Sequence, residues 1–470
     1  MNTELTQEIQ QQRDRILREN PKINLVAPCK IGQGITKLTA KEIHLLTEVF
    51  EEKVKDIGVF IPASGSGSRM FEFLYDFLTN QSEDNRGNVE RFLNKIKSFA
   101  FYRFLPTETR KALETFDISL EQFVSFLLNA EGMGFGDLPK ALIPFHLNDP
   151  FVVNAIQEHI IQSAKLKQEN TAFHFSIQKR YERNFEVSIR QLEGLTGHNF
   201  EVSYSEQNTE TDSYVFYNNG DLVIDENGQP LRRPAGHGAL LTNLQALNKE
   251  LIFIRNIDNV QHYSKSTKSI QMWSVLGALL YEIRLEIKKL YKNPTVEGLQ
   301  DLNEKFHLYS PSELESIRDS SAILKLIDRP IRVCGMVRNE GQPGGGPFLV
   351  EENGVVTKQI VEKAQISQNG EQYRQMIQST HFNPVMMAVC IFNPEGKKYD
   401  LFQFRDASKY FVVSKKQKGE EVRFVELPGL WNGSMANWNT LFVEIPNETF
   451  SPVKTVLDLL NDAHLAGSIE

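Results

Sequence analysis

Residues 58–74 read Gly-Val-Phe-Ile-Pro-Ala-Ser-Gly-Ser-Gly-Ser-Arg-Met-Phe-Glu-Phe-Leu. The stretch begins with a short apolar run, which predicts a buried strand over 58–63. A serine-glycine loop follows at 64–69, and the aromatic-rich segment that begins at Met70 predicts a helix. A strand, a glycine loop and a helix in this order form one repeating unit of an α/β sheet.

Strand and helix signals continue to alternate farther along the chain. Residues 172–176 and 251–258 predict two more strands, and residues 270–291 predict a long amphipathic helix. This alternation favours a mostly parallel sheet with helices on both faces. We therefore expect an α/β fold with a Rossmann-like, mostly parallel mixed sheet.

The pattern also divides the chain into regions. We expect an N-terminal helical segment (1–56), an α/β core (57–330) with a helical insertion at about 80–132, and a C-terminal α+β portion (331–470). Thr39 and Glu42 have the spacing of a capping box at a helix start. Four aromatic residues of the insertion are expected in its core, namely Phe92, Phe99, Phe101 and Phe104. The chain is expected to end in a strand over 441–446 and a helix that ends near His464.

Composition narrows the class of protein. The 470 residues carry a net charge of -8, and 24% are charged while 40% are hydrophobic. This balance is typical of a globular protein and lacks the basic character of nucleic-acid-binding domains. Three cysteines without metal-ligand spacing favour neither a disulfide framework nor a zinc site. Because every apolar run is too short to cross a bilayer, we expect a soluble cytoplasmic protein with no nucleic-acid or membrane partner.

The loop at 64–69 has two interpretations. It lacks the Gly-Lys-Ser/Thr ending of a P-loop, and Met70 stands where a dinucleotide fingerprint has its third glycine. It is therefore either a structural turn or a mononucleotide phosphate loop. In a phosphate loop, Gly65 and Gly67 would let backbone N–H groups approach phosphate oxygens, and the Arg69 guanidinium would bind pyrophosphate.

Lys140 is an unusual residue for its surroundings. It lies between Pro139 and Pro144 in an apolar segment. An unpaired ammonium group is costly in such surroundings, so Lys140 is expected to face an anion. The alternative is a surface lysine whose stem is covered while its ammonium group stays in water.

Asp258 ends the predicted strand 251–258, with Asn256 and Asn259 beside it. Open α/β sheets bind ligands at the carboxyl ends of their strands, so this carboxylate is a candidate metal or polar-ligand site. A residue that only caps the strand end is the alternative.

A second turn contains Gly236, His237 and Gly238. The two glycines would allow backbone amides to approach a nucleobase edge-on. For the imidazole of His237, a local hydrogen bond or a role in backbone geometry is favoured over a role as a catalytic base.

Taken in order, these segments resemble the nucleotidyltransferases that make nucleotide sugars, in particular the UDP-sugar and UDP-N-acetylhexosamine pyrophosphorylases. The matching segments are the loop 64–69, Leu138-Pro139-Lys140, the strand end at Ser176, the segment with Gln207, the turn 234–238, Asn256-Ile257-Asp258-Asn259, residues 358–362, His381-Phe382-Asn383 and residues 450–454. Residues 344–348 and 427–433 instead resemble a bacterial family seen mainly in Bacteroidetes, domain of unknown function 4301.

The resemblance implies a fold like that of the nucleotide-diphospho-sugar transferases. It also implies that a sugar 1-phosphate attacks a nucleoside triphosphate, with UTP favoured, and that pyrophosphate leaves. Mg²⁺ would be the cofactor and Asp258 its ligand, whereas Asp400 and Asp406 are candidates for a second carboxylate only by residue type. The implied roles are catalysis by Arg69, Lys140, Asp258 and Lys454; nucleotide binding by Gly65, Gly67, Ser176, Gln207, Gly236, His237 and Gly238; and sugar binding by Asn259, Glu362 and Asn383.

Three other functions remain open at the level of sequence. The first is a nucleotide or nucleotide-sugar binding protein without turnover, which the missing second carboxylate favours. The second is a glycosyltransferase on the same fold. The third is a partner-binding surface formed by Trp431, Trp438, Phe442 and the glycine-rich loop 344–346.

Overall fold

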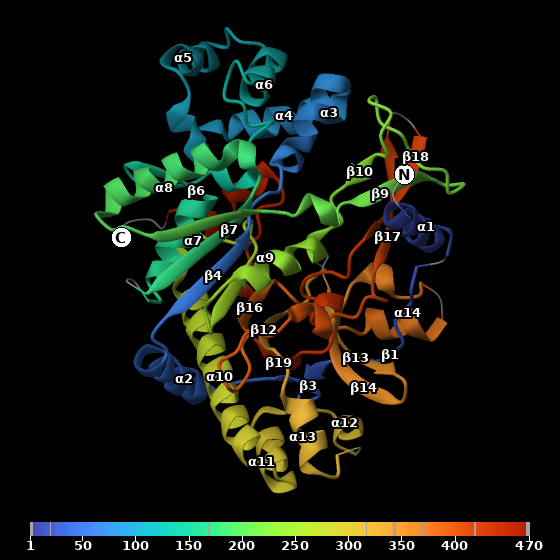
Figure 1. Cartoon of the computed structure of the whole chain (residues 1–470). Helices are drawn as coiled ribbons and strands as arrows, with labels where there is room; N and C mark the ends of the chain where they lie inside the picture. Colours follow the sequence, from blue (N-terminus) through green and yellow to red (C-terminus); the bar gives the residue numbers. More distant parts are fainter. Residues whose placement is uncertain are drawn as a thin grey trace. The chain divides into compact units, whose positions relative to one another are not determined.

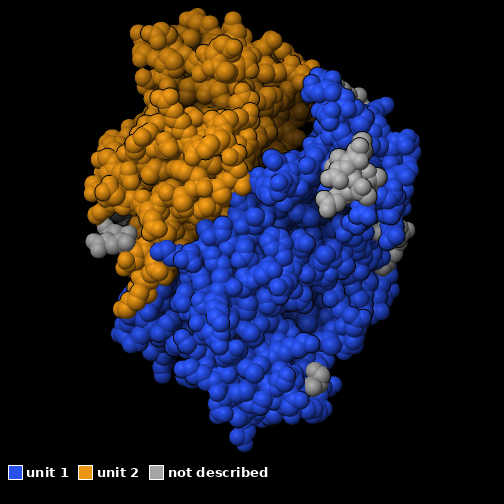
Figure 2. Space-filling model, in the orientation of Figure 1, with its two compact units in different colours: residues 1–54, 207–254, 275–445 blue, residues 55–206, 255–274, 446–470 orange. Residues whose placement is uncertain are grey.

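A computed structural model describes residues 3–18, 20–167, 170–315, 317–341, 345–368, 370–417 and 420–466. The chain forms two compact units, coloured blue and orange in Figure 2. Unit 1 comprises Met1–Val54, Gln207–Ile254 and Val275–Ile445, and unit 2 comprises Lys55–Glu206, Arg255–Ser274 and Pro446–Glu470. Each unit therefore combines residues that are far apart in the sequence.

Three parallel strands form the main sheet of unit 2. β4 (Ile57–Pro62) pairs with β7 (Thr171–Ile177), which lies beside it in Figure 1, and β7 pairs with β8 (Glu201–Glu206). β4 and β7 are buried over most of their length, as expected for strands covered on both faces. Helices α7 (Ala155–Ala164) and α8 (Glu182–Thr196) lie in the connections, because parallel neighbours need long crossovers.

The stretch after β4 in unit 2 contains helices and one hairpin. Its elements are α3 (Glu72–Thr79), α4 (Glu83–Asn94), α5 (Thr107–Thr115), α6 (Leu120–Leu128) and the hairpin of β5 (Pro144–Asn148) with β6 (Phe151–Asn154). Phe92, Phe99 and Phe101 are buried and their rings pack together, so they are core residues as predicted. Phe104 is 54% exposed, so the same prediction is wrong for this residue, which ends a short turn at the edge of the cluster.

A mixed sheet forms the centre of unit 1. Its strands, in spatial order, are β2 (Lys30–Ile31), β3 (Gly34–Thr36), β19 (Asn439–Glu444), β12 (Ile331–Arg338), β16 (Met386–Cys390) and β11 (Ile252–Arg255). β2, β3, β19 and β12 run parallel, whereas β16 and the short β15 (His381–Phe382) pair with β12 in the antiparallel direction. The predicted α/β class with a mostly parallel mixed sheet is confirmed.

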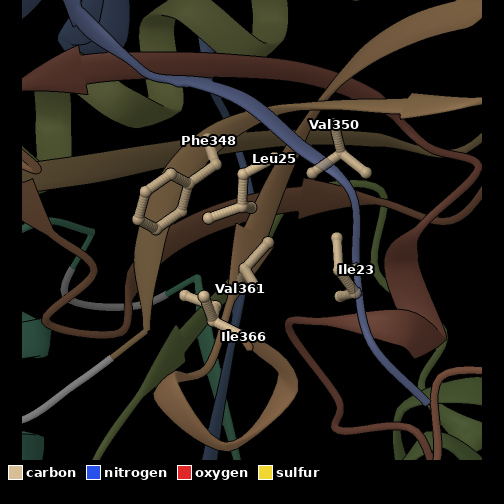
Figure 3. Packing of buried hydrophobic residues seen from close by; sticks show 6 residues of the cluster. All are labelled: Ile23, Leu25, Phe348, Val350, Val361 and Ile366. Atoms are coloured by element: carbon tan, nitrogen blue, oxygen red, sulfur yellow. The ribbon is translucent and has the colours of Figure 1, made fainter. Parts of the chain in front are cut away.

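Two smaller antiparallel sheets complete unit 1. The first consists of β1 (Leu25–Pro28), β13 (Gly346–Glu352) and β14 (Val355–Val361), and the second of β10 (Arg232–Arg233), β9 (Ser213–Tyr217), β18 (Glu420–Glu426) and β17 (Phe411–Gln417). Figure 3 shows the core of the first sheet, where side chains from three segments point toward one another. They are Ile23, Leu25, Phe348, Val350, Val361 and Ile366.

The remaining helices are α1 (Thr3–Leu17), α2 (Ala40–Lys53), α9 (Leu241–Ala246), α10 (Thr267–Lys292), α11 (Val296–Phe306), α12 (Pro311–Glu315), α13 (Ser320–Ile327) and α14 (Gly370–Ile377). α2 begins at the predicted capping box: Thr39 Oγ1 accepts from the Glu42 amide, and the Glu42 carboxylate accepts from the Thr39 amide. Within the described part of the chain, no helix is both long enough and apolar enough to span a membrane.

Two predictions of local structure are wrong. The N-terminal segment contains β1, β2 and β3 between its helices, because β1 pairs with β13, whose residues lie more than 300 positions away. The final helix is replaced by short 3₁₀ turns between Asn447 and His464, since Pro446 and Pro452 lack the N–H that a continuous helix needs.

Candidate functional site

Asp258 lies in the turn that follows β11, within unit 2, and its side chain is 14% exposed. Two ammonium groups contact the same carboxylate oxygen. Lys140 Nζ lies 3.3 Å and Lys454 Nζ 2.9 Å from Asp258 Oδ2. Lys140 Nζ also donates to the carbonyl oxygen of Val453 at 2.9 Å. We call Lys140, Asp258 and Lys454 the lysine–aspartate cluster.

Backbone hydrogen bonds join the serine-glycine loop to the segment that carries Lys140 of this cluster. The Gly67 amide donates to the Leu138 carbonyl at 2.9 Å, and the Lys140 amide donates to the Gly65 carbonyl at 3.1 Å. The loop and the Lys140 segment are therefore adjacent, although a helical stretch separates them in the sequence. This adjacency agrees with the phosphate-loop interpretation.

The segment that carries Lys454 is attached to the turn of Asp258. The Val453 amide donates to the Asp258 carbonyl at 2.8 Å, and the Ser451 amide donates to Asn259 Oδ1 at 2.9 Å. Asn259 was expected to bind sugar. Its Oδ1 supports the backbone that leads to Lys454, and sugar binding by Asn259 stays a prediction.

The cluster combines two ammonium groups with the Asp258 carboxylate, and the Asp458 carboxylate lies close enough to raise the pKa of Lys140. Burial by itself raises the pKa of Asp258, but the ammonium groups of Lys140 and Lys454 outweigh burial and hold that pKa below its usual value. Burial lowers the pKa of Lys140, and the neighbouring Lys454 lowers it further, while Asp258 opposes both. Two ammonium groups that meet at one oxygen are placed to contact the same anion.

The two glycines of the loop have different surroundings. A Cβ added to Gly65 would meet no heavy atom within 4 Å in the described parts of the chain. A Cβ added to Gly67 would lie 2.5 Å from Ile143 Cδ1 and 2.9 Å from the Leu138 carbonyl oxygen. Gly67 is thus required by packing, whereas Gly65 faces open space. Arg69, in the following 3₁₀ turn, is exposed.

We expect a Gly65→Ala variant to keep wild-type stability and to lose affinity for nucleoside triphosphates, because its methyl group would block the approach of a phosphate to the loop. Gly67→Ala is the matched comparison and should destabilise the fold by about 1–3 kcal/mol through overpacking. Thermal unfolding with and without nucleotide measures both effects. Undiminished nucleotide binding by Gly65→Ala would show that the loop is a structural turn.

Ser176 and Gln207 are the other predicted nucleotide-binding residues in this part of the sequence. Ser176 is the second-last residue of the buried strand β7 of unit 2, and its Oγ is buried without a hydrogen-bond partner among the described residues. Gln207 belongs to unit 1, and its Nε2 is likewise buried and unpartnered within the described ranges. Nucleotide binding by both residues stays a prediction.

The donor set of a metal ion is incomplete. In the described portions of the chain, no three His, Cys, Asp or Glu side chains are arranged to hold a metal. Asp400 and Asp406 cap turns of unit 1, where they accept hydrogen bonds from the amides of Phe402 and Ser408. A single carboxylate such as Asp258 fits Mg²⁺ that arrives bound to substrate phosphates, but not an all-protein Mg²⁺ cage.

The turn of Gly236 and Gly238 packs against another segment of unit 1. A Cβ on Gly236, whose φ is +74°, would lie 2.6 Å from Glu426 Oε2. A Cβ on Gly238 would lie 2.2 Å from the Pro428 carbonyl oxygen. Internal contacts therefore explain why both positions are glycine, and the approach of a nucleobase to their backbone amides stays a prediction.

The imidazole of His237 makes a local hydrogen bond, which is the role that the sequence favoured over a catalytic base. Its Nδ1 accepts from the Leu430 amide at 2.9 Å, and its ring stacks on Trp431 with centroids 4.1 Å apart. Burial lowers the pKa of His237 to about 4, so the ring is neutral at physiological pH. Because the acceptor is Nδ1, the proton of the neutral ring lies on Nε2.

Unit 1 contains a cavity of about 750 Å³ that includes Glu362 in its wall. Phe348, Val361 and Ile366, three of the side chains in Figure 3, form part of the apolar lining. Glu362 is hydrogen-bonded to Trp431 and to Asn432, whose Nδ2 lies 3.4 Å from Oε1. Burial raises the pKa of Glu362 above its usual value.

The other predicted sugar-binding residue, Asn383, is buried in unit 1. Its amide donates to the Gly345 carbonyl at 2.9 Å, and its Oδ1 accepts from the Val385 amide at 3.0 Å. Nδ2 is buried without a hydrogen-bond partner in the described ranges. The structure does not place Asn383 in the wall of the Glu362 cavity.

Trp431 and Asn432 were not predicted as neighbours of His237 and Glu362. Their segment, 427–433, stood out in the sequence, but nothing in it indicated what it contacts. Trp438 and Phe442 are buried, so the interpretation of these residues as a partner-binding surface is wrong. The same interpretation included the glycine-rich loop 344–346, of which Gly344 lies outside the described residues.

A family model for a domain of unknown function (DUF4301) matches residues 2–465, which is nearly the whole chain. The chain belongs to the DUF4301 family. The resemblance of residues 344–348 and 427–433 to this family is thereby confirmed. No curated protein matches this DUF4301 chain in sequence.

Solved structures similar to this DUF4301 protein include three proteins that are named as UDP-sugar phosphorylases or pyrophosphorylases. A mutant UDP-glucose pyrophosphorylase from Leishmania major in complex with UDP-glucose is 12% identical, with a TM-score of 0.45, and the match covers 98% of this chain and 75% of that chain. A UDP-glucose phosphorylase from Trypanosoma brucei is 14% identical, with a TM-score of 0.43, and the match covers 93% of this chain and 69% of that chain. A protein assigned as a UDP-N-acetylglucosamine pyrophosphorylase from Entamoeba histolytica is 12% identical, with a TM-score of 0.42, and the match covers 89% of this chain and 80% of that chain.

Proposed function

We propose that this protein is a nucleotidyltransferase that transfers a nucleotidyl group from a nucleoside triphosphate, UTP in the first place, to a sugar 1-phosphate. The observation that carries the proposal is the lysine–aspartate cluster, in which Lys140 and Lys454 both contact Asp258 Oδ2. The adjacent loop with its open position at Gly65 adds a place where a phosphate can approach the backbone. Such a constellation suits phosphoryl and nucleotidyl transfer, where positioning and charge neutralisation provide most of the catalysis.

In the proposed reaction, an oxygen of the sugar 1-phosphate attacks the α-phosphorus of the triphosphate. A new P–O bond forms to that oxygen, the bond between the α-phosphorus and the bridging oxygen breaks, and the electron pair leaves with pyrophosphate. Lys140 and Lys454 would neutralise the charge that develops on the phosphate oxygens, and Arg69 would bind the departing pyrophosphate. No covalent bond to the protein is needed.

Mg²⁺ remains part of the proposal as an ion that enters with the triphosphate. Asp258 would hold it, and the ion would supply additional positive charge to the phosphates. The role of Asp258 in the free protein is then to keep the two ammonium groups together until an anion replaces it as their partner.

Glu362 is proposed to bind the sugar within unit 1. Its carboxylate lies in the wall of a cavity with apolar and polar sides, which is the usual composition of small-molecule sites. A carboxylate accepts hydrogen bonds from sugar hydroxyl groups.

The test of the proposed function is a release assay for pyrophosphate with nucleoside triphosphates, a panel of sugar 1-phosphates and Mg²⁺. A preceding thermal-shift screen selects the pair, because a ligand that binds only the folded state raises its apparent stability. We expect a shift with one nucleotide and pyrophosphate release with one sugar 1-phosphate. Nucleotide binding without release for every sugar would contradict turnover.

A binding protein without turnover is the second candidate function. It is favoured by one observation, namely that no three His, Cys, Asp or Glu side chains among the described residues are grouped to hold a metal ion. Transfer of a sugar from a finished nucleotide sugar would be distinguished from both by glycoside formation without pyrophosphate release.

Anion binding by the cluster should depend on pH. The pKa of Lys140 is lowered, so this lysine loses its proton at a lower pH than the ordinary value of about 10.4. An anion binds the protonated form, so affinity should fall as pH rises through the Lys140 pKa, while Asp258 stays charged above about pH 4. Titration with sulfate, whose own charge is constant, measures this between about pH 6 and pH 10. Lys140→Met should flatten the profile, and an affinity that rises with pH would contradict the assignment.

A further inference from the structure

A glutamate and two histidines form a buried hydrogen-bonded chain in unit 2, separate from the lysine–aspartate cluster. His146, on β5, is hydrogen-bonded through Nδ1 to Glu158 Oε2 of α7 at 2.9 Å. Its other nitrogen, Nε2, is hydrogen-bonded to His464 Nδ1 at 2.9 Å. Glu158 and His146 are 0% exposed and His464 is 3% exposed. We call these three residues the histidine chain.

The histidine chain holds both ends of the segment that contains Lys454. His464 lies at one end and is also hydrogen-bonded to the backbone of Ser451 at the other end. The neighbouring Ala463 carbonyl accepts from the His262 amide at 2.8 Å. Residues 451–464 therefore form a loop that is closed by a buried imidazole.

Lys454 lies inside this closed loop, next to Val453, whose amide donates to the Asp258 carbonyl at 2.8 Å. The loop consists mainly of 3₁₀ turns, with an isolated bridge between Pro452 and Asn259 and buried side chains at Val456 and Leu459. The amides of Lys454 and Thr455 donate to Asp458 Oδ2 at 2.8 and 2.7 Å, which fixes the local turn. The side chain of Lys454 is 58% exposed, so surrounding atoms restrain its ammonium group only in part. Its distance to Asp258 thus depends on where the backbone of the loop is held.

We propose that Glu158, His146 and His464 are positioning residues that fix the loop 451–464 and thereby keep Lys454 at the anion-binding cluster. The glutamate orients His146, since its carboxylate occupies one ring nitrogen and directs the other toward His464. Gln162 Nε2 donates to Glu158 Oε1 at 3.0 Å and so orients the carboxylate in turn. The effect on turnover rests on the proposed function, whereas the effect on the loop and on anion binding does not.

Two substitutions of His464 test the proposal. His464→Leu removes both hydrogen bonds, and His464→Asn retains a polar group near the position of Nδ1. Hydrogen exchange followed by mass spectrometry should show faster exchange across 446–466 in His464→Leu, with partial recovery in His464→Asn. His174→Leu is the matched control, because His174 is also buried with both ring nitrogens hydrogen-bonded, but to Ser203 and Ser205. It should leave exchange across 446–466 unchanged.

A double-mutant cycle with Lys454→Ala separates positioning from general destabilisation. Sulfate affinity should fall about ten-fold or more in His464→Leu, because small displacements of a binding group are costly. In the Lys454→Ala background the same change should have less than about a two-fold effect, since residues that act through one another are not additive. Equal effects in both backgrounds, or unchanged exchange across 446–466, would overturn the proposal. If wild-type protein releases no pyrophosphate, the proposed function fails, but exchange and sulfate affinity still decide this inference.

Discussion

An Asp258→Asn variant should lose at least about 100-fold in the rate of pyrophosphate release, which is the usual effect of removing one preorganised electrostatic group from an active site. The amide keeps the size of the side chain but lacks the charge that holds Lys140 and Lys454 at one oxygen, 3.3 and 2.9 Å away. It also removes the carboxylate proposed to hold Mg²⁺. Steady-state assays at saturating Mg²⁺ and both substrates measure the loss.

The fold should survive this substitution. Lys140 still donates to the Val453 carbonyl, and its lowered pKa allows it to give up its proton once its counter-charge is gone. We expect a cost of about 1–3 kcal/mol in the free energy of unfolding, as for other buried hydrogen-bonded groups that lose a partner.

Glu114→Gln provides the matched control for Asp258→Asn. It removes a carboxylate from unit 2 that lies 2.7 Å from Lys97 on the exposed surface. Surface pairs of this kind contribute between about 0 and 1 kcal/mol, so both stability and turnover should stay close to wild type. Full activity of Asp258→Asn would contradict the nucleotidyltransferase assignment.

A Gly238→Ala variant should lose about 1–3 kcal/mol or more of stability in the absence of any ligand, because its methyl group would overpack the interior of unit 1. The added Cβ would lie 2.2 Å from the Pro428 carbonyl oxygen, 2.9 Å from the Pro428 carbonyl carbon and 3.0 Å from the Leu427 carbonyl carbon. All three atoms belong to the backbone, which cannot rotate away as a flexible side chain does. Denaturant unfolding monitored by tryptophan fluorescence measures the change.

Gly194→Ala is the control for the same chemical change at an open position. Gly194 lies in α8, and an added Cβ would meet no heavy atom within 4 Å in the described parts of the chain. Alanine should stabilise this helix by about 0.5–1 kcal/mol. If Gly238→Ala instead unfolds like wild type and only loses nucleotide affinity, the glycine faces a ligand and not Pro428.

Local patterns predicted much of unit 2. The apolar run at 58–63, the loop and the helix after it appear as β4, the serine-glycine loop and α3, because burial periodicity and turn chemistry are properties of contiguous residues. The capping box of Thr39 and Glu42 was predictable for the same reason. The strand β1 was not, because its stability comes from pairing with β13, a remote segment.

Motifs indicated the pieces of the candidate site but not their contacts. Lys140 was expected to face an anion, and in the folded protein that anion is Asp258, 118 positions away. At Gly238 an added Cβ would meet the Pro428 backbone, so packing accounts for the glycine, and the approach of a nucleobase to its amide stays a prediction. A glycine pattern shows that something approaches the backbone closely and does not show what it is.

The sequence by itself determined the α/β class, the strands that appear as β4, β7, β11 and β19, the capping of α2 and the membership of the family, since these depend on residue pattern along the chain. Only the tertiary structure decided that Lys454 reaches Asp258 from 196 positions away and that His464 reaches His146 from 318 positions away. Such contacts bring together residues that no local propensity links. They form because the packed core holds distant segments at fixed places, where buried polar groups must find partners.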